Sequence, residues 1–353
     1  MEKVRILGAG LSGLSAAINL ALKGIPVEVL EKRPAVGGQI NPNFQVLHAK
    51  GKTPKEYLSE LNLTPDFRQL PLKKAFFSTR SRDFDFKLKR NVFFIQRGGS
   101  HSLEQGLYRQ ALGLGVEFKF NQLVPETEAH VVACGPSRVD AMAYGEVYEN
   151  ASFEEDHFFM MYDDRYSPKG WYLYAVPYDG KLAVINCVCQ PHVGRVRELL
   201  GKALKEKEIL RRSVRGSPVA YTGGFGNASI PSTAVRGGRF YVGEAAGFQD
   251  PFRGFGMRFA LESGKFAADA IAHALDYDSI WRREFMPQFS LDYSRRFFLS
   301  LFGSGLVDVA YRGMKSGDAI DFVSGNVSGP FGNLLKHLFL HMELAKRKLT
   351  GFW

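Results

Sequence analysis

A glycine-rich turn near the start of the chain is the feature most able to do chemistry. A G-x-G-x-x-G motif is formed by Gly8, Ala9, Gly10, Leu11, Ser12 and Gly13. Glycines at this spacing allow a tight turn, leave room for a pyrophosphate and let a following helix pack closely on a strand. The free N–H groups at the start of such a helix attract an anion.

The residues around the turn predict the elements that must hold it. Residues 4–7 read as a short buried strand, and apolar residues recur at helical spacing over 14–24. Residues 25–30 read as a second strand, with Glu31 at its end. An acid about 20 residues after the glycines can accept hydrogen bonds from an adenosine ribose, and its charge disfavours the 2′-phosphate of NADP. We therefore predict that this segment binds a dinucleotide.

A second glycine-punctuated segment lies far downstream. Residues 239–242 read as a strand that leads into Gly243 and Glu244. The turn that follows contains Gly254, Phe255, Gly256 and Met257. An alanine-rich stretch at helical spacing comes next, so we expect a second helix start whose N–H groups favour an anionic partner.

Together the two segments resemble the flavoproteins with two dinucleotide-binding motifs, and among them the geranylgeranyl reductase-like branch. In that branch the first motif continues past the acid into a glycine pair, as at Gly37 and Gly38, and the second reads G-D-A-A-G, a proline, G-x-G and A-x-x-S-G-x-x-A-A. The resemblance implies FAD as the cofactor, with Glu244 on the ribityl hydroxyls and 254–257 facing the flavin pyrimidine edge. Glu244 stands where the branch has aspartate and is longer by one methylene group.

Further cofactor contacts are implied by the same resemblance. It adds Lys32, Gly38, Arg97, Val124 and Gly135 to the FAD-binding set. Arg97 precedes a capping box of Ser102 and Gln105, which predicts a helix that runs to about Gly115. For Arg97, a solvated charge at the end of a strand is the alternative.

The resemblance implies an α/β fold: a Rossmann-like FAD-binding domain of the glutathione-reductase type, an inserted antiparallel-sheet substrate domain and C-terminal helices. The expected boundaries are 1–50, 91–150 and 236–275 for the FAD-binding domain, 51–90 and 151–235 for the substrate domain, and 276–353 for the helical region. Alternating charged and apolar residues predict a hairpin over 77–96. The patterns also predict paired strands over 171–176 and 182–188, a helix over 193–214 and closing helices over 279–315 and 334–348.

The composition is that of an ordinary globular chain of 353 residues. Cys134, Cys187 and Cys189 include no CxxC pair, so we expect neither a disulfide framework nor a thiolate zinc site. We also expect no metal site from the eight histidines. No apolar run reaches the roughly 18 residues of a membrane span. The expected location is the cytoplasm, with peripheral membrane contact left open.

The net charge of +10 is concentrated in two stretches, 68–90 and 195–215. Such faces are most often solvated, but they could steer an anionic substrate, a diphosphate, an acidic electron-donor protein or a membrane surface. No nucleic-acid recognition module accompanies the charge, so no nucleic acid is expected as a partner. No second G-x-G-x-x-G is visible for NAD(P)H, so the donor is either transiently bound NAD(P)H or a small redox protein. The oligomeric state stays open.

The resemblance also implies a substrate. Residues 172–177 are a degenerate match to the aromatic-x-Trp-x-Phe-Pro motif that the branch uses for prenyl chains. The expected substrate residues are Tyr172, Tyr174, Val176 and Pro177; on a strand the first three share one face, and packing of that face into the core is the alternative.

We therefore expect an FAD-dependent oxidoreductase that acts on an apolar, isoprenoid or polyene substrate by hydride transfer at flavin N5. The residues leave the catalytic proton donor unassigned. The alternatives are a flavoprotein amine oxidase or monooxygenase, a non-redox polyene cyclase and a non-catalytic flavin-binding protein.

Phenylalanine is abundant, with 29 residues in the chain. Many of them fall in or after the second motif: Phe248, Phe252, Phe255, Phe259, Phe285, Phe289, Phe297, Phe298 and Phe302. We expect these aromatic side chains to line a cavity over the flavin ring, with ordinary core packing as the alternative.

Overall fold

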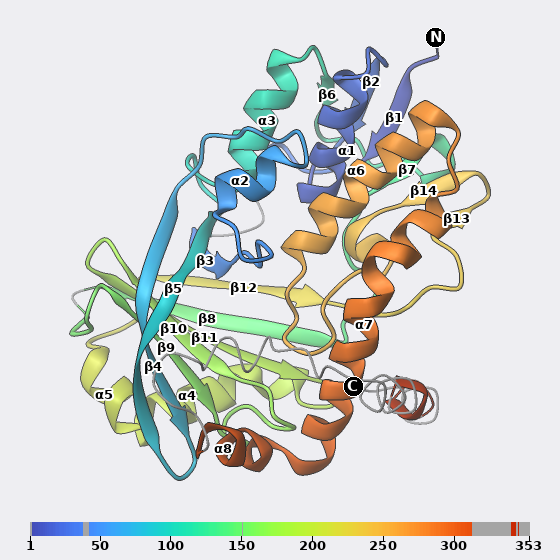
Figure 1. Ribbon diagram of the computed structural model, residues 1–353. Coiled ribbons are helices and arrows are strands. Elements are labelled where there is room, and N and C mark those ends of the chain that lie inside the picture. Colours follow the sequence, from blue (N-terminus) through green and yellow to red (C-terminus); the bar gives the residue numbers. More distant parts are fainter. Residues whose placement is uncertain (1, 38–41, 150, 313–339, 344, 346–353) are drawn as a thin grey trace. The chain divides into compact units, whose positions relative to one another are not determined.

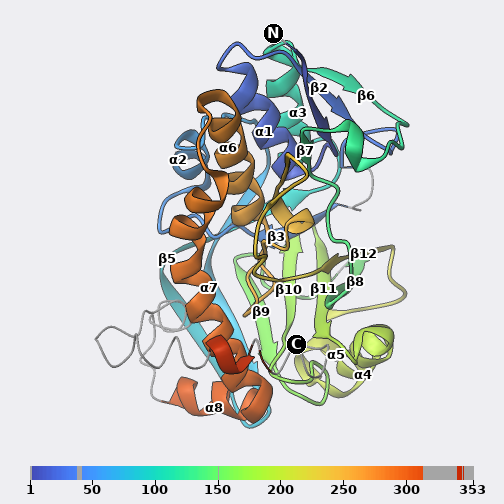
Figure 2. The same cartoon turned by 90° about the vertical axis from the view of Figure 1, so that its right-hand side faces the viewer.

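The computed structural model describes residues 2–37, 42–149, 151–312, 340–343 and 345, and it divides into two compact units. Unit 1 comprises 1–70, 93–139 and 226–289, and unit 2 comprises 71–92, 140–225 and 290–353. Figures 1 and 2 show the elements of both units from two directions. The predicted α/β class, with a Rossmann-like sheet and a second, largely antiparallel sheet, is confirmed.

Unit 1 is built on a six-stranded sheet of order β13-β14-β7-β1-β2-β6. Its strands are β1 (Val4–Leu7), β2 (Val27–Leu30), β6 (Glu117–Lys119), β7 (Val131–Val132), β13 (Val235–Arg236) and β14 (Arg239–Tyr241). The pairs β1–β2, β1–β7, β2–β6 and β7–β14 are parallel. Parallel neighbours put the carboxyl ends of β1, β7 and β14 at one edge, where ligands bind in such sheets.

The helices of unit 1 include those that the sequence predicts and one, α2, that it does not. They are α1 (Leu11–Ala21), α2 (Pro54–Ser59), α3 (Leu103–Gly113), α6 (Met257–His273) and the beginning of α7 (Tyr277–Phe302), with short 3₁₀ turns η1 (Glu126–Glu128) and η3 (Gly243–Ala245). The hydroxyl of Ser102 caps α3 by accepting the N–H of Gln105 at 3.3 Å. The Gln105 side chain donates to the carbonyl oxygen of Val36 at 2.7 Å, so it fastens the segment after β2 to α3.

Unit 2 contains most of an eight-stranded sheet of order β12-β8-β11-β10-β9-β4-β5-β3. Its strands are β4 (Gln69–Thr79), β5 (Asp83–Arg97), β8 (Ala141–Glu149), β9 (His157–Tyr162), β10 (Leu173–Tyr178), β11 (Lys181–Cys189) and β12 (Ala220–Gly226). The short strand β3 (Asn43–Val46) pairs with the end of β5 inside unit 1. The predicted hairpins β4–β5 and β10–β11 are confirmed, although β4 begins eight residues earlier than the predicted residue 77.

The predicted single helix over 193–214 is wrong. The short turn η2 (Val193–Arg195) leads into α4 (Val196–Glu206), the chain is extended at Lys207, and α5 (Glu208–Ser213) follows. The two helices lie along one side of the unit 2 sheet (Figure 1). Leu199, Leu200 and Ala203 of α4 pack into the core against that face. Helices in proteins are stabilised mainly by such tertiary packing and less by the intrinsic propensity of their residues.

The predicted helix over 279–315 is interrupted at Gly303, where α7 ends and α8 (Ser304–Arg312) begins. Asp164 causes the break: its Oδ2 atom accepts the N–H of Ser304 at 2.7 Å, and a Cβ atom at Gly303 would lie 2.1 Å from that oxygen. Residues 313–315 and most of the predicted helix 334–348 lie outside the described residues. Among the helices that are described, none combines the length and hydropathy needed to cross a bilayer.

Candidate dinucleotide-binding site

The glycine turn after β1 is shaped by close backbone contacts. Gly8 has a φ of +106°, and a Cβ atom there would lie 2.5 Å from the carbonyl oxygen of Ala133. A Cβ atom at Gly13 would lie 2.0 Å from the carbonyl oxygen of Gly8. Both positions therefore need glycine for the tight turn and for the close approach of α1 to the sheet.

The middle glycine faces open space. A Cβ atom at Gly10 would meet no atom within 4 Å, and Gly10 is the N-cap of α1 without a side-chain hydrogen bond. The start of α1 therefore keeps N–H groups that no side chain caps, beside a position with room for a ligand. Both features fit the pyrophosphate of a dinucleotide.

Glu31, the acid after β2, is bonded to the backbone of the turn. Its Oε2 atom accepts the N–H of Ala9 at 2.8 Å, and its Oε1 atom accepts the N–H of Arg33 at 2.9 Å. A carboxylate has about four acceptor sites, so capacity remains for the ribose contact, which stays a prediction. The structure adds a role that the sequence did not indicate: Glu31 ties the end of β2 to the glycine turn.

The second motif lies against the first. A Cβ atom at Gly243 would lie 2.9 Å from Oγ of Ser12, and one at Gly264 would lie 2.3 Å from the carbonyl oxygen of Ser12. The hydroxyl of Ser15 donates to the carbonyl oxygen of Leu261 at 2.7 Å. The backbones of α6 and α1 are therefore in direct contact, and this contact brings the first and second motifs together although they are distant in sequence.

The serine of the A-x-x-S-G pattern also has a structural task. The hydroxyl of Ser263 accepts the N–H of Gly243 at 2.8 Å and donates to the carbonyl oxygen of Ala260 at 3.1 Å. It thereby holds η3 against α6. Sequence reasoning assigned no role to Ser263 or Gly264, although both belong to the motif on which the resemblance depends.

The turn before α6 is held from within. The Oδ1 atom of Asp250 accepts the N–H groups of Phe252 at 2.6 Å and Arg253 at 3.2 Å, and the N–H of Gly254 donates to the Asp250 carbonyl oxygen at 2.9 Å. Gly256 is the N-cap of α6 and makes no side-chain hydrogen bond. The start of α6, like that of α1, is therefore a helix terminus without a side-chain cap.

Glu244 is the titratable group of this region whose pKa is most relevant to the site. Burial raises its pKa to about 7, and the positive charge of Arg97 opposes that rise. Arg97 itself is 15% exposed at its side chain and is paired with Glu104, and it donates to Gln45 Oε1 at 3.1 Å. Arg97 is therefore a largely buried partner of Glu104 and not a solvated charge, while its contact with the cofactor stays a prediction.

The remaining predicted cofactor residues have no contact that tests them. Lys32 is exposed after β2, and Val124 is half-buried in a segment where the N–H of Gln122 donates to the carbonyl oxygen of Glu31 at 2.9 Å. A Cβ atom at Gly135, after β7, would meet no atom within 4 Å. Gly38 lies outside the described residues.

The expectation that the phenylalanines line a cavity is wrong for four of them. Phe248, Phe259, Phe285 and Phe289 are buried to 3% exposure or less. Their rings pack on one another at centroid distances of 4.9–6.3 Å, with Trp281 beside Phe248 at 5.1 Å. These side chains form the core between η3, α6 and the start of α7, so the alternative of core packing holds for them.

The predicted substrate strand has two distinct faces. Leu173 and Ala175 belong to the core cluster packed with α4. Tyr172, Tyr174 and Val176 alternate with them and share the other face, where Tyr174 is half-buried. Pro177 pairs with Leu182, a member of the α4-side core, so it lies on the opposite face from the three.

The face that carries Tyr174 extends across neighbouring strands. Tyr174 lies directly opposite Met160 of β9 and Ile185 of β11, and Ile185 lies opposite Gly145 of β8. Cross-strand partners share a face, so this row is apolar from β9 to β8. Met160 and Tyr174 are both half-buried, and side-chain surface therefore remains accessible on this face.

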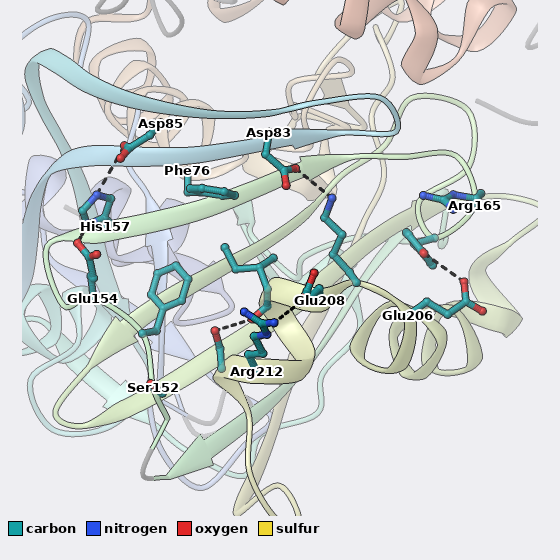
Figure 3. A pocket seen from close by; sticks show the side chains of 15 residues that line it. Phe76, Asp83, Asp85, Ser152, Glu154, His157, Arg165, Glu206, Glu208 and Arg212 are labelled. Carbon is teal, nitrogen blue, oxygen red and sulfur yellow. Dashed lines mark hydrogen bonds and ion pairs between the residues drawn. The ribbon is translucent and has the colours of Figure 1, made fainter.

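Unit 2 also has a cavity of about 740 Å³ at the two basic stretches (Figure 3). Its three permanently charged basic residues are each paired: Lys207 with Asp83 at 3.0 Å, Arg165 with Asp163 at 2.6 Å, and Arg212 with Glu208. Asp85, Glu154 and Glu206 add further carboxylates. The lining therefore does not offer the cationic surface that an anionic ligand needs.

One cluster beside that cavity carries possible metal ligands and was missed from the sequence. His157 Nδ1 lies 2.7 Å from Asp156 Oδ1 and 2.8 Å from Glu154 Oε2, within a group whose ligand atoms lie within 4.8 Å of one another. The other Asp156 oxygen pairs with Lys74 Nζ at 2.8 Å. The group is therefore a cluster of ion pairs, in which Lys74 neutralises the carboxylate of Asp156.

Comparison with known proteins agrees with the site. Residues 6–53 match the family model described as an NAD(P)-binding Rossmann-like domain. Methylenetetrahydrofolate–tRNA-(uracil-5-)-methyltransferase from Dictyoglomus thermophilum is 41% identical over 75 residues, and 4,4′-diapolycopene oxygenase from Methylomonas sp is 52% identical over 40 residues. These matches span 21% and 11% of this chain and only 14% and 8% of the two relatives, so they are local.

The structural neighbours cover nearly the whole chain. A geranylgeranyl bacteriochlorophyll reductase-like protein from Thermoplasma acidophilum superposes with a TM-score of 0.73 at 16% identity, over 99% of each chain. The chain therefore shares the fold of this reductase-like protein. A flavin-dependent brominase has a TM-score of 0.66 at 15% identity, over 98% of this chain and 100% of its own. The resemblance stated from the motifs is therefore confirmed at the level of the fold.

Proposed function

We propose that this chain is an FAD-dependent oxidoreductase that acts on an apolar, isoprenoid or polyene substrate. The observation that carries the proposal is the close packing in unit 1 of two helices that each follow a glycine-rich turn. The start of α1, at Ser12, lies against Gly264 in the interior of α6, and neither helix has a side-chain cap at its start. Two such termini in one unit suit a ligand with a diphosphate and a polar ring edge.

The roles within the site follow from what each group can donate or accept. The N–H groups at the start of α1 would hold the pyrophosphate, beside the open position at Gly10. Glu31 would accept from the ribose, and Glu244 would accept from the ribityl chain. The N–H groups at 255–257 would face the pyrimidine edge, where they favour negative charge; the N–H of Gly254 is already used by the carbonyl oxygen of Asp250. When bound, FAD supplies hydride transfer.

The substrate assignment rests on the half-exposed face of the unit 2 sheet. Its row of Met160, Tyr174, Ile185 and Gly145 is apolar; Met160 and Tyr174 are half-buried, whereas Ile185 and Gly145 are buried. A flat chain of double bonds can lie on such a surface through apolar contact alone. The proposed partners are therefore a small apolar substrate and an electron donor, which is either NAD(P)H or a small redox protein.

A second candidate is oxygenation of a polyene. The 40-residue match to a 4,4′-diapolycopene oxygenase favours it, because the name of that relative gives diapolycopene as the molecule that it oxygenates. The two candidates share cofactor and substrate class and differ in the product.

The test is a single anaerobic turnover. The purified chain is loaded with FAD, reduced without oxygen and mixed with a panel of prenyl alcohols, prenyl diphosphates and polyenes. A product heavier by two hydrogens, with reoxidation of the flavin, supports reduction, and a product that gains oxygen only when air is admitted supports oxygenation. A rearranged product without flavin reoxidation would indicate a cyclase, and no product with any apolar substrate would contradict the substrate assignment.

A further inference from the structure

The side chain of Glu244 is longer than the aspartate of the related branch, and it reaches a second polar residue. Its Oε1 atom accepts a hydrogen bond from Nε2 of Gln249 at 3.1 Å. The same Nε2 atom donates to the carbonyl oxygen of Gly254 at 3.0 Å. Gln249 thus links the carboxyl group on η3 to the turn that precedes α6.

The amide of Gln249 is enclosed by backbone. A Cβ atom at Gly226 would lie 2.4 Å from Gln249 Oε1 and 2.5 Å from Nε2, and one at Gly256 would lie 3.1 Å from Glu244 Oε1. Gln249 is 6% exposed, and its Oε1 atom is buried with no hydrogen-bond partner in the described part of the chain. A buried oxygen without a hydrogen-bond partner destabilises the folded protein. A functional role for Gln249 would explain why glutamine stands at this position.

The charge environment makes the carboxyl group responsive to pH. Arg97 of β5 is the charged group that acts on Glu244, and its guanidinium is shared with Glu104 and Gln45. Burial, opposed by Arg97, places the pKa of Glu244 at about 7. Hydrogen-bond donors that face the ionised carboxylate lower such a pKa, and Gln249 is one of these donors.

We propose that Gln249 is a positioning residue that holds the carboxyl group of Glu244 for the ribityl hydroxyls of FAD, and that FAD binding releases a proton from this group. The inference rests on the proposed function, since it takes FAD as the cofactor. A ribityl hydroxyl donates to the carboxylate form, so bound FAD favours the charged state. Binding therefore becomes tighter as pH rises through the pKa of the free protein.

The test is the dissociation constant of FAD measured by titrating the apoprotein across neutral pH. With a free group that titrates at about 7, the unmodified chain should bind FAD about tenfold more tightly at about pH 8 than at about pH 6. Glu244→Gln removes the titrating group and should flatten this profile. Gln249→Met keeps nearly the same volume but lacks the donor, so the midpoint should move from about pH 7 to about pH 8.

A second background separates positioning from packing. In Glu244→Asp the shorter side chain should no longer reach Gln249. The double variant with Gln249→Met should therefore have the same pH profile of FAD binding as Glu244→Asp alone. The inference is overturned if Gln249→Met weakens binding by one factor at every pH, leaves binding unchanged, or shifts the profile equally in both backgrounds. If the unmodified chain binds no FAD at any pH, the proposed function itself fails.

Discussion

The contact between α1 and α6 makes a sharp prediction for Gly264→Ala. In a helix interior, alanine is more stable than glycine by about 1 kcal/mol. At Gly264, however, the new Cβ atom would lie 2.3 Å from the carbonyl oxygen of Ser12 and 2.9 Å from the amide nitrogen of Ala16. Both are backbone atoms, so the two helices must move apart. Overpacking of this kind costs about 1–3 kcal/mol. Because neither contacting atom can move without its helix, we take the upper end, which leaves a net loss of stability of about 2 kcal/mol after the gain from helix propensity.

A matched control is available in unit 2. Gly201 lies inside α4, and a Cβ atom there would meet no atom within 4 Å. Gly201→Ala should therefore gain up to about 1 kcal/mol from helix propensity alone. The two variants make the same chemical change and should shift stability in opposite directions.

The assay is thermal unfolding of the apoprotein followed by circular dichroism, with FAD titration of each variant. One kcal/mol corresponds to roughly 2–4 °C for a domain of the size of unit 1, so unit 1 of Gly264→Ala should unfold several degrees below that of the unmodified chain. Its FAD affinity should fall by about tenfold or more, because both helix starts belong to the site. The reasoning is refuted if Gly264→Ala unfolds at the same temperature as the unmodified chain or above it.

Three further variants test other parts of the account. Gly10→Ala should unfold at the temperature of the unmodified chain, since its Cβ meets no atom within 4 Å, but should lose about tenfold or more in FAD affinity because that space is assigned to the pyrophosphate; equal affinity would remove the pyrophosphate from this turn. Tyr174→Ala should raise the KM for a prenyl substrate about tenfold at unchanged FAD affinity, and an unchanged KM would place the substrate elsewhere. Gly303→Ala should lose about 1–3 kcal/mol in thermal unfolding, because its Cβ would lie 2.1 Å from Asp164 Oδ2, while FAD binding stays the same; unchanged stability would show that α8 does not need this contact.

Local patterns were enough to predict much of unit 1. The alternation of strand, glycine turn, helix and strand over 4–31 depends on neighbours in sequence, and the structure has β1, α1 and β2 in those places. The start of α6 was found for the same reason, because glycines before a helical run mark a terminus. In both segments local preference and tertiary packing agree.

The missed features depend on contacts that no local pattern encodes. Gly264 is constrained by Ser12 at the other end of the chain, and the hydroxyl of Ser263 is oriented by Gly243. At Lys207 the chain is extended between α4 and α5, and both helices bury apolar side chains in the same core. Phe248 and Phe285 were placed in a cavity because composition counts aromatic residues without showing what covers them, and the structure packs them at 5.2 Å in the core.

The identity of the dinucleotide is the central claim, since the matching family model is described as NAD(P)-binding whereas the second motif and the fold favour FAD. Titration of the apoprotein with FAD, NAD and NADP, followed by fluorescence and calorimetry, decides between them. The account predicts saturation at one FAD per chain, with the bound flavin absorbing at about 450 nm, and markedly weaker binding of both nicotinamide dinucleotides. Tight binding of NAD or NADP with no binding of FAD would contradict it.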